Sequence, residues 1–89
     1  MKAIVTVVGK DRVGIIAGVC TLLAQLNINI MDISQTVMQE LFTMTMLVDM
    51  AACTCPYGEV SAALNAKGEE MGLSIRIQRE DIFQAMHRV

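Results

Sequence analysis

The sequence has few aromatic residues and no cluster of basic ones. Its only aromatics are Phe42, Tyr57 and Phe83, and tryptophan is absent. The net charge is -2 and the pI is about 5.2. Proteins that hold nucleic acids need a basic surface for the phosphates and commonly stack bases on aromatic rings. The composition therefore argues against direct nucleic-acid binding.

Cysteine and histidine are also scarce. The three cysteines, an odd number, are typical of a reducing compartment rather than of a disulfide framework. Cys20 falls in an apolar helical pattern and is predicted to be a small core residue, whereas Cys53 and Cys55 form the only clustered pair. The single histidine, His87, is distant in sequence. The chain supplies too few ligands for a closed zinc site, so we predict neither a metal nor a cofactor.

Charged residues are absent from Val13 to Met31, a length that approaches a membrane span. Thr21, Gln25 and two asparagines interrupt this stretch, and two shorter elements fit it better than one membrane helix does. The first apolar run, after Lys2, is about as long as one strand and too short for the core of a signal peptide. We therefore expect a cytoplasmic protein without a membrane partner.

Apolar residues, in contrast, are abundant. They make up 54% of the 89 residues, and the mean hydropathy is +0.51. A single domain of this length buries only about 60–65% of its unfolded surface. The remaining apolar area favours self-association, so we expect a homodimer or a higher homo-oligomer.

The period of the apolar residues changes along the chain between that of a strand and that of a helix. The pattern predicts strands over 1–8, 28–39, 41–50 and 73–78, helices over 13–26 and 56–72, and a short helix within 80–89 that Asp81 caps. This order is typical of the α+β, ferredoxin-like βαββαβ fold, a four-stranded antiparallel sheet with two helices on one face. The other face is expected to be half apolar and uncovered.

Two of the strands have distinctive patterns. Residues 41–50 alternate strictly, with an apolar face and a face that is half hydroxyl, whereas the mixed polarity of 28–39 predicts an edge strand or a bulge. These strands contain five of the eight methionines, and core filling explains them better than a soft-metal site does. The five are Met31, Met38, Met44, Met46 and Met50.

A short polar turn joins the first strand to the first helix. The start of a helix presents free backbone N–H groups, which favour anions such as carboxylates. Gly9 is expected to let the chain reverse after the strand, and Gly14 to remove a Cβ where the helix passes close to the sheet or a ligand. Asp11 is the candidate N-cap. The residues alone leave open a purely structural turn, in which Asp11 caps the helix and Arg12 is solvated.

The same turn resembles a signature of the ACT domain, a small regulatory module that senses amino acids. Gly9-Lys10-Asp11-Arg12-Val13-Gly14-Ile15-Ile16-Ala17 is similar to the usual D-R-P/x-G-L/I-L/I pattern, and Leu26-Asn27-Ile28-Asn29-Ile30-Met31-Asp32-Ile33 matches the second signature. With Ser34-Gln35-Thr36 and the closing Asp81-Ile82-Phe83-Gln84-Ala85-Met86, nearly the whole chain resembles the small stand-alone ACT proteins (UPF0237-like) of bacteria and archaea. These are relatives of the ACT units of the glycine cleavage system transcriptional repressor. The resemblance implies a single ACT domain over residues 1–89, with 80–89 as a C-terminal helical extension.

The resemblance also implies where a ligand would bind. In amino-acid-binding ACT domains the ligand lies between the first strand–helix turn of one subunit and the start of the second strand of its neighbour. The implied ligand-binding residues are Asp11, Arg12, Val13, Gly14 and Ile15 of one chain with Asn29 and Ile30 of the other. Backbone N–H groups near Gly14 would take the α-carboxylate, Asp11 the ammonium and the Asn29 amide either group. Val13 replaces the common proline, and Gly9 offers no side chain where serine-binding relatives carry a polar one.

Catalysis is not predicted. No nucleophile has a nearby base in sequence, and the Gly-rich loop ending in Phe-Arg, which acylphosphatases carry on this fold, is missing. Two non-enzymatic hypotheses follow. The first is a homodimeric regulatory module whose bound amino acid bridges the subunits. The alternative is a ligand-free assembly module that binds an unidentified protein partner, or another copy of itself, through the open sheet face and the C-terminal helix.

Overall fold

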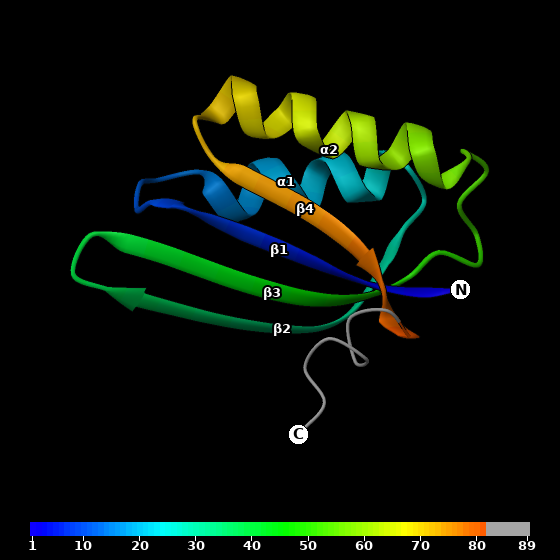
Figure 1. Ribbon diagram of the computed structural model, residues 1–89, viewed down its shortest axis with the longest axis horizontal. Helices are drawn as coiled ribbons and strands as arrows, with labels where there is room; N and C mark the ends of the chain where they lie inside the picture. Colours follow the sequence, from blue (N-terminus) through cyan, green and yellow to red (C-terminus); the bar gives the residue numbers. More distant parts are fainter. Residues whose placement is uncertain (82–89) are drawn as a thin grey trace.

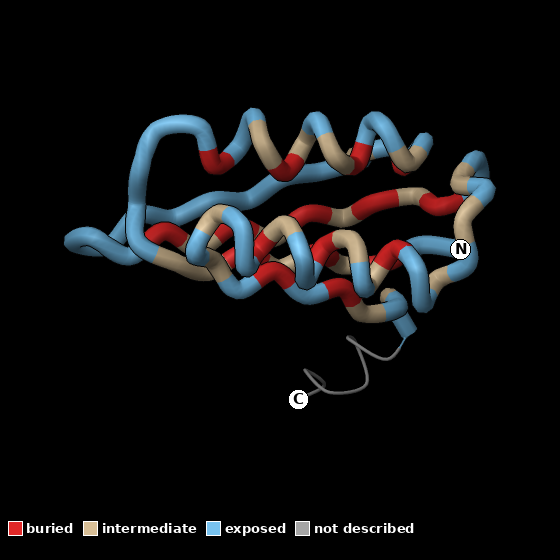
Figure 2. Tube along the Cα trace, turned by 90° about the horizontal axis from the view of Figure 1, so that it is seen from above, coloured by how far each residue is buried: buried red, intermediate tan, exposed pale blue. Residues whose placement is uncertain are grey.

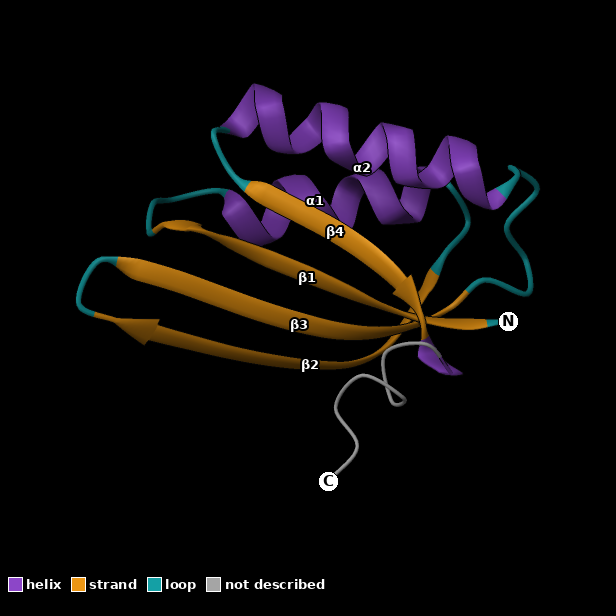
Figure 3. Ribbon diagram, in the orientation of Figure 1, coloured by secondary structure: helices purple, strands orange, loops and turns teal. Residues whose placement is uncertain are grey.

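The computed structural model describes residues 1–81, which form a four-stranded sheet with two helices packed on one face (Figures 1 and 3). The elements are β1 (Lys2–Lys10), α1 (Ile15–Gln25), β2 (Asn29–Met38), β3 (Leu41–Asp49), α2 (Tyr57–Met71) and β4 (Ser74–Arg79). The strand order is β2-β3-β1-β4, and all neighbouring strands are antiparallel. The ferredoxin-like βαββαβ prediction is confirmed. The predicted helix carrying Ile82, Phe83 and Met86 lies outside the described residues.

The core lies between the sheet and the helices. Alternate residues of β1 and β3 face it, because successive side chains of a strand point to opposite faces of the sheet. Val5, Val7, Met44 and Met46 have no exposed surface, and Phe42 retains only 4%. Core filling therefore accounts for the methionines of β3. It does not account for Met31 and Met38 of β2, which are 47% and 69% exposed.

The helices begin and end close to the predicted positions. Gly72 closes α2 with a left-handed φ of 70°, as its sequence position indicates. The buried stripe of α1 is Ile15, Val19 and Leu23, and Leu22 is only partly buried. Within residues 1–81 no helix combines the length and apolar character needed to cross a lipid bilayer.

β2 is an edge strand and also contains an irregularity, which confirms both expectations from its mixed polarity. The pairing register with β3 shifts between Ile30 and Asp32, so that Met31 is the extra residue. Every residue from Met31 to Met38 is exposed, and Figure 2 shows this strand pale blue along most of its length. Ile33 and Val37 pair with the inward-facing Met46 and Phe42, yet they are 42% and 50% exposed. The helices thus leave the inner face of β2 largely uncovered.

Candidate ligand site at the β1–α1 turn

The turn between β1 and α1 lies two residues later than predicted, at 11–14, because β1 continues through Gly9 to Lys10 and α1 begins at Ile15. The N-cap of α1 is Gly14, and no side chain caps the helix. The prediction that Asp11 is the N-cap is therefore wrong. The Asp11 backbone N–H instead donates to the Glu40 carbonyl at 2.7 Å, which joins the turn to the β2–β3 hairpin.

The two glycines have different roles from those predicted. Gly14 has φ 93°, and a Cβ there would have open space around it, so a left-handed backbone rather than a close approach to the sheet requires glycine. Gly9 makes no turn and pairs with Phe42 inside β1. A Cβ on Gly9 would lie 2.3 Å from Cδ2 of Leu73, so its missing side chain makes room for the residue before β4.

Arg12 connects the turn to the end of α2. Its Nη2 donates a hydrogen bond to the carbonyl of Met71, the last residue of that helix. A cation near a helix C-terminus is favourable because the last carbonyls lack intrahelical donors. Arg12 is thus not simply solvated. The turn is held by the hairpin through Glu40 on one side and by α2 through Met71 on the other.

The start of α1 offers unprotected backbone donors. The first backbone bond after the turn runs from the Gly18 N–H to the Gly14 carbonyl at 2.9 Å, so the N–H groups of residues 15–17 precede the helical ladder. Ile15 is buried and offers a ligand only its backbone, whereas the side chain of Val13 is fully exposed. Asp11, Arg12 and Gly14 are also exposed. The turn can therefore meet an anion with backbone groups and an ammonium with the Asp11 carboxylate.

Within one chain, the other two predicted ligand-binding residues lie far from this turn. Asn29 pairs with Asp49 of β3, and Asp49 pairs with Lys2 at the start of β1. The turn, in contrast, follows Lys10 at the other end of β1. Eight residue steps at about 3.3 Å per residue separate the two ends by roughly 26 Å. Asn29 and Ile30 are thus at the opposite end of the sheet from the turn (Figure 1).

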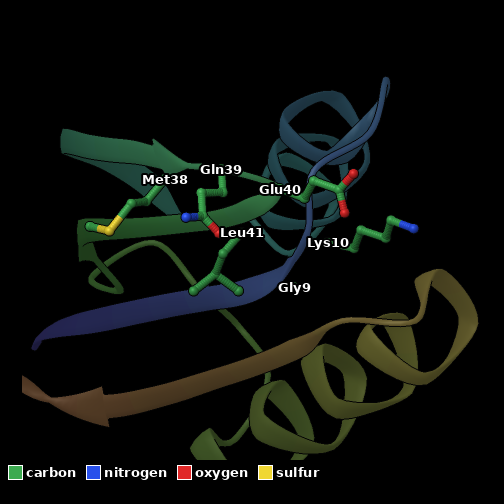
Figure 4. A pocket seen from close by; sticks show the side chains of 6 residues that line it. All are labelled: Gly9, Lys10, Met38, Gln39, Glu40 and Leu41. Atoms are coloured by element: carbon green, nitrogen blue, oxygen red, sulfur yellow. The ribbon is translucent and has the colours of Figure 1, made fainter.

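A hollow of about 360 Å³ lies beside the turn and was not predicted from the sequence (Figure 4). It is lined by Gly9, Lys10, Met38, Gln39, Glu40 and Leu41. Leu41 alternates with the buried Phe42, so the hollow opens on the sheet face that the helices do not cover. The feature of the sequence that could have indicated this hollow is a pair of apolar residues, Met38 and Leu41, on either side of the polar two-residue hairpin turn.

The titratable groups with altered pKa values lie elsewhere. Burial raises the pKa of the Cys20 thiol, which is partly buried against the core as its helical position indicates. Burial also raises the pKa of Tyr57, whose hydroxyl donates to the Ile77 carbonyl at 2.9 Å. Cys53 donates to the Cys55 carbonyl at 3.7 Å. Residues 1–81 contain no group of three or more histidine, cysteine, aspartate or glutamate side chains that would hold a metal ion.

A family model for the ACT domain matches residues 2–78, which is nearly all of the described chain. The chain belongs to the ACT domain family. This ACT domain is 56% identical to a UPF0237 protein of Clostridium acetobutylicum, and the alignment covers 100% of both chains. It is similar to an ACT domain protein from Streptococcus pneumoniae, with 44% identity, a TM-score of 0.83 and 94% of each chain covered.

A further similarity links this ACT domain to part of a longer protein. A structure described as a glycine cleavage system transcriptional repressor superposes with a TM-score of 0.73 and 28% identity, over 86% of this chain and 44% of that one. The family and its regulatory neighbours point to a regulatory module rather than to a catalytic one.

Proposed function

We propose that this chain is a non-catalytic, cytoplasmic regulatory module that binds an amino acid between two copies of itself. The observation that carries the proposal is the separation of the turn and Asn29 within one chain. A single subunit cannot use both halves of the implied site on one small ligand, because a strand length of roughly 26 Å lies between them. A second subunit is therefore required.

The exposed edge of β2 is the surface best suited to that second subunit. An edge strand presents unpaired N–H and C=O groups, and proteins usually protect it with lysine, proline or a covering segment. β2 contains neither lysine nor proline. Its inner face exposes Ile33 and Val37, and Ile16 of α1 is also 39% exposed. A second copy would pair with the backbone of β2 and cover these apolar side chains.

Antiparallel pairing of two β2 strands would also join the two halves of the site. With the two-fold axis at the middle of β2, Asn29 of the partner subunit lies opposite Met38. Met38 pairs with Leu41, which pairs with Lys10 immediately before the turn. The start of one β2 strand would thus lie at the same end of the joined sheet as the turn of the other subunit, about 14 Å from Lys10 across three strand spacings. The α1 N–H groups would hold the α-carboxylate and Asp11 the ammonium, and the partner's Asn29 would face the ligand from across the hairpin.

The first experiment is thermal unfolding of the purified protein with each proteinogenic amino acid at millimolar concentration. A ligand that binds only the folded state raises the midpoint, by an amount set by its concentration relative to Kd. We expect a selective, saturable rise that Asn29→Ala abolishes. Asn65→Ala, at an exposed position of α2, is the matched control and should keep the response.

The dimer is tested separately by Val37→Lys, which adds a charge to the exposed inner face of β2. We expect this variant to be monomeric in sedimentation velocity and to lose the ligand response. A monomeric wild-type protein, or a ligand response that survives in the monomeric variant, would refute the interface site. A stable dimer without any ligand response would instead favour the assembly module, in which self-association is itself the function.

A further inference from the structure

The hollow at the β2–β3 hairpin has an uneven distribution of polarity. Figure 4 shows the charged ends of Lys10 and Glu40 towards one side, Met38 towards the other and Leu41 between them. Met38 and Leu41 are 69% and 50% exposed, so each leaves apolar surface in contact with water. The hollow therefore offers a cation, an anion and an apolar wall within one small space.

The two charges are free to meet a ligand. The ion pairs among residues 1–81 are Lys67 with Glu70 and Arg79 with Asp81, so neither Lys10 nor Glu40 is paired within that part of the chain. The Glu40 backbone is nevertheless fixed, because its carbonyl accepts the Asp11 N–H at 2.7 Å. The hollow thus has two charged side chains without an ion-pair partner in residues 1–81, next to a backbone that the Asp11–Glu40 hydrogen bond holds.

The hairpin turn that carries these side chains has a strained backbone at Gln39. Gln39 has φ 58°, a left-handed value at which glycine or asparagine is favoured in two-residue hairpins. Glycine at position 39 would relieve the backbone strain, but it would also remove the Gln39 side-chain amide from the lining of the hollow. Sparsely populated backbone conformations gather at ligand-binding positions, where other interactions maintain them.

We propose that this hollow is a second site, complete within one chain, for a free amino acid with an apolar side chain. Glu40 would bind the α-ammonium, Lys10 the α-carboxylate, and Met38 with Leu41 would contact the apolar side chain. A fatty acid would leave Glu40 unpaired and a simple amine would leave Lys10 unpaired. The volume of about 360 Å³ is near the lower end of the range for small-molecule pockets, about 300–1,000 Å³. The proposal does not depend on the interface site.

The test is a titration of the ¹⁵N-labelled protein with L-leucine, L-methionine and L-phenylalanine, followed by amide NMR shifts. We expect saturable shifts centred on residues 9–10 and 38–41, with millimolar affinity because both charges are exposed. Lys10→Met and Glu40→Gln should each weaken binding about two- to fivefold, the range that an exposed ion pair supplies. Isocaproate and isoamylamine, which each lack one charged group of leucine, should show the same loss.

The controls separate this site from the interface site. Lys67→Met and Glu69→Gln make the same changes on α2 and should bind like the wild type. Val37→Lys, the variant expected to be monomeric, should also keep the hairpin shifts, since all the lining residues belong to one chain. Absence of saturable shifts at residues 38–41 with all three amino acids would overturn the proposal. Equal affinity of Lys10→Met, Glu40→Gln and the wild type would overturn it as well.

Discussion

Gly68 allows a sharp test of how α2 packs beside the candidate site. Alanine is normally the better residue in a helix interior, by about 1 kcal/mol. We nevertheless expect Gly68→Ala to destabilise the protein, because a Cβ there would lie 2.7 Å from the Leu73 carbonyl oxygen. The Leu73 N–H also donates to the Gly68 carbonyl at 2.7 Å, so the obstacle is backbone held against the helix.

The magnitude follows from the distance. Restoring an ordinary contact of 3.4 Å requires the start of β4 or the end of α2 to move by several tenths of an ångström. Overpacking costs about 1–3 kcal/mol, and a clash with a held backbone oxygen belongs to the upper part of that range, about 2–3 kcal/mol, which exceeds the gain of about 1 kcal/mol in helix propensity. We expect a net loss of roughly 1–2 kcal/mol, or a fall in the unfolding midpoint of roughly 5–15 °C for a domain of this size.

Gly58 is the matched control in the first turn of the same helix. No atom lies within 4 Å of a Cβ at this position, so Gly58→Ala should stabilise the protein by about 0.5–1 kcal/mol. Urea unfolding of both variants at one protein concentration measures the difference, since self-association would make stability depend on concentration. A Gly68→Ala protein as stable as the wild type would refute the reasoning.

Substitutions at three further positions test the turn and the hydrogen bonds of α2. Gly14→Ala should lower the free energy of unfolding by about 1–2 kcal/mol, because φ at this position is 93°. Gly14→Asn should lower it less, and equal losses in the two variants, measured by thermal unfolding, would argue against backbone strain. Arg12→Met should lower the free energy of unfolding by about 0.5–1 kcal/mol, because it removes the hydrogen bond to the Met71 carbonyl. Arg12→Lys should recover part of that loss. An unchanged thermal midpoint in Arg12→Met would show that the bond contributes nothing. Tyr57→Phe removes the bond to the Ile77 carbonyl and should cost about 1 kcal/mol near neutral pH. Because burial raises the pKa of Tyr57 above 10.0, the folded state favours the neutral phenol, and the wild type should lose this advantage as the pH rises through the raised pKa. A constant difference between wild type and Tyr57→Phe in urea titrations up to about pH 11 would contradict the assignment.

The fold could be predicted from the sequence because its signals are local. The alternation in β3 marks a strand with one buried face, and Gly72 marks the end of α2. Once the order of strands and helices is known, few arrangements bury all the apolar faces, and the ferredoxin-like fold is one of them. The mixed polarity of β2 likewise indicated an edge strand with an irregularity.

The candidate site was predictable only in part. The signatures indicated the turn, but they did not distinguish a glycine needed for its backbone, Gly14, from one needed to admit Leu73, Gly9. They also did not indicate that Asp11 uses its backbone N–H rather than its carboxylate. The roles of Gly9 and Asp11 depend on residues distant in sequence, Leu73 and Glu40, and a local pattern does not contain that information.

The elements, their order and the family thus follow from the sequence alone, because periodicity and signatures are properties of neighbouring residues. The hydrogen bond from Arg12 to Met71 and the hollow beside Lys10 depend instead on how the chain folds in space. The separation of Asn29 from the turn by a full strand length depends on it as well. These are contacts and separations between distant segments, and they exist only after the strands have paired in one register.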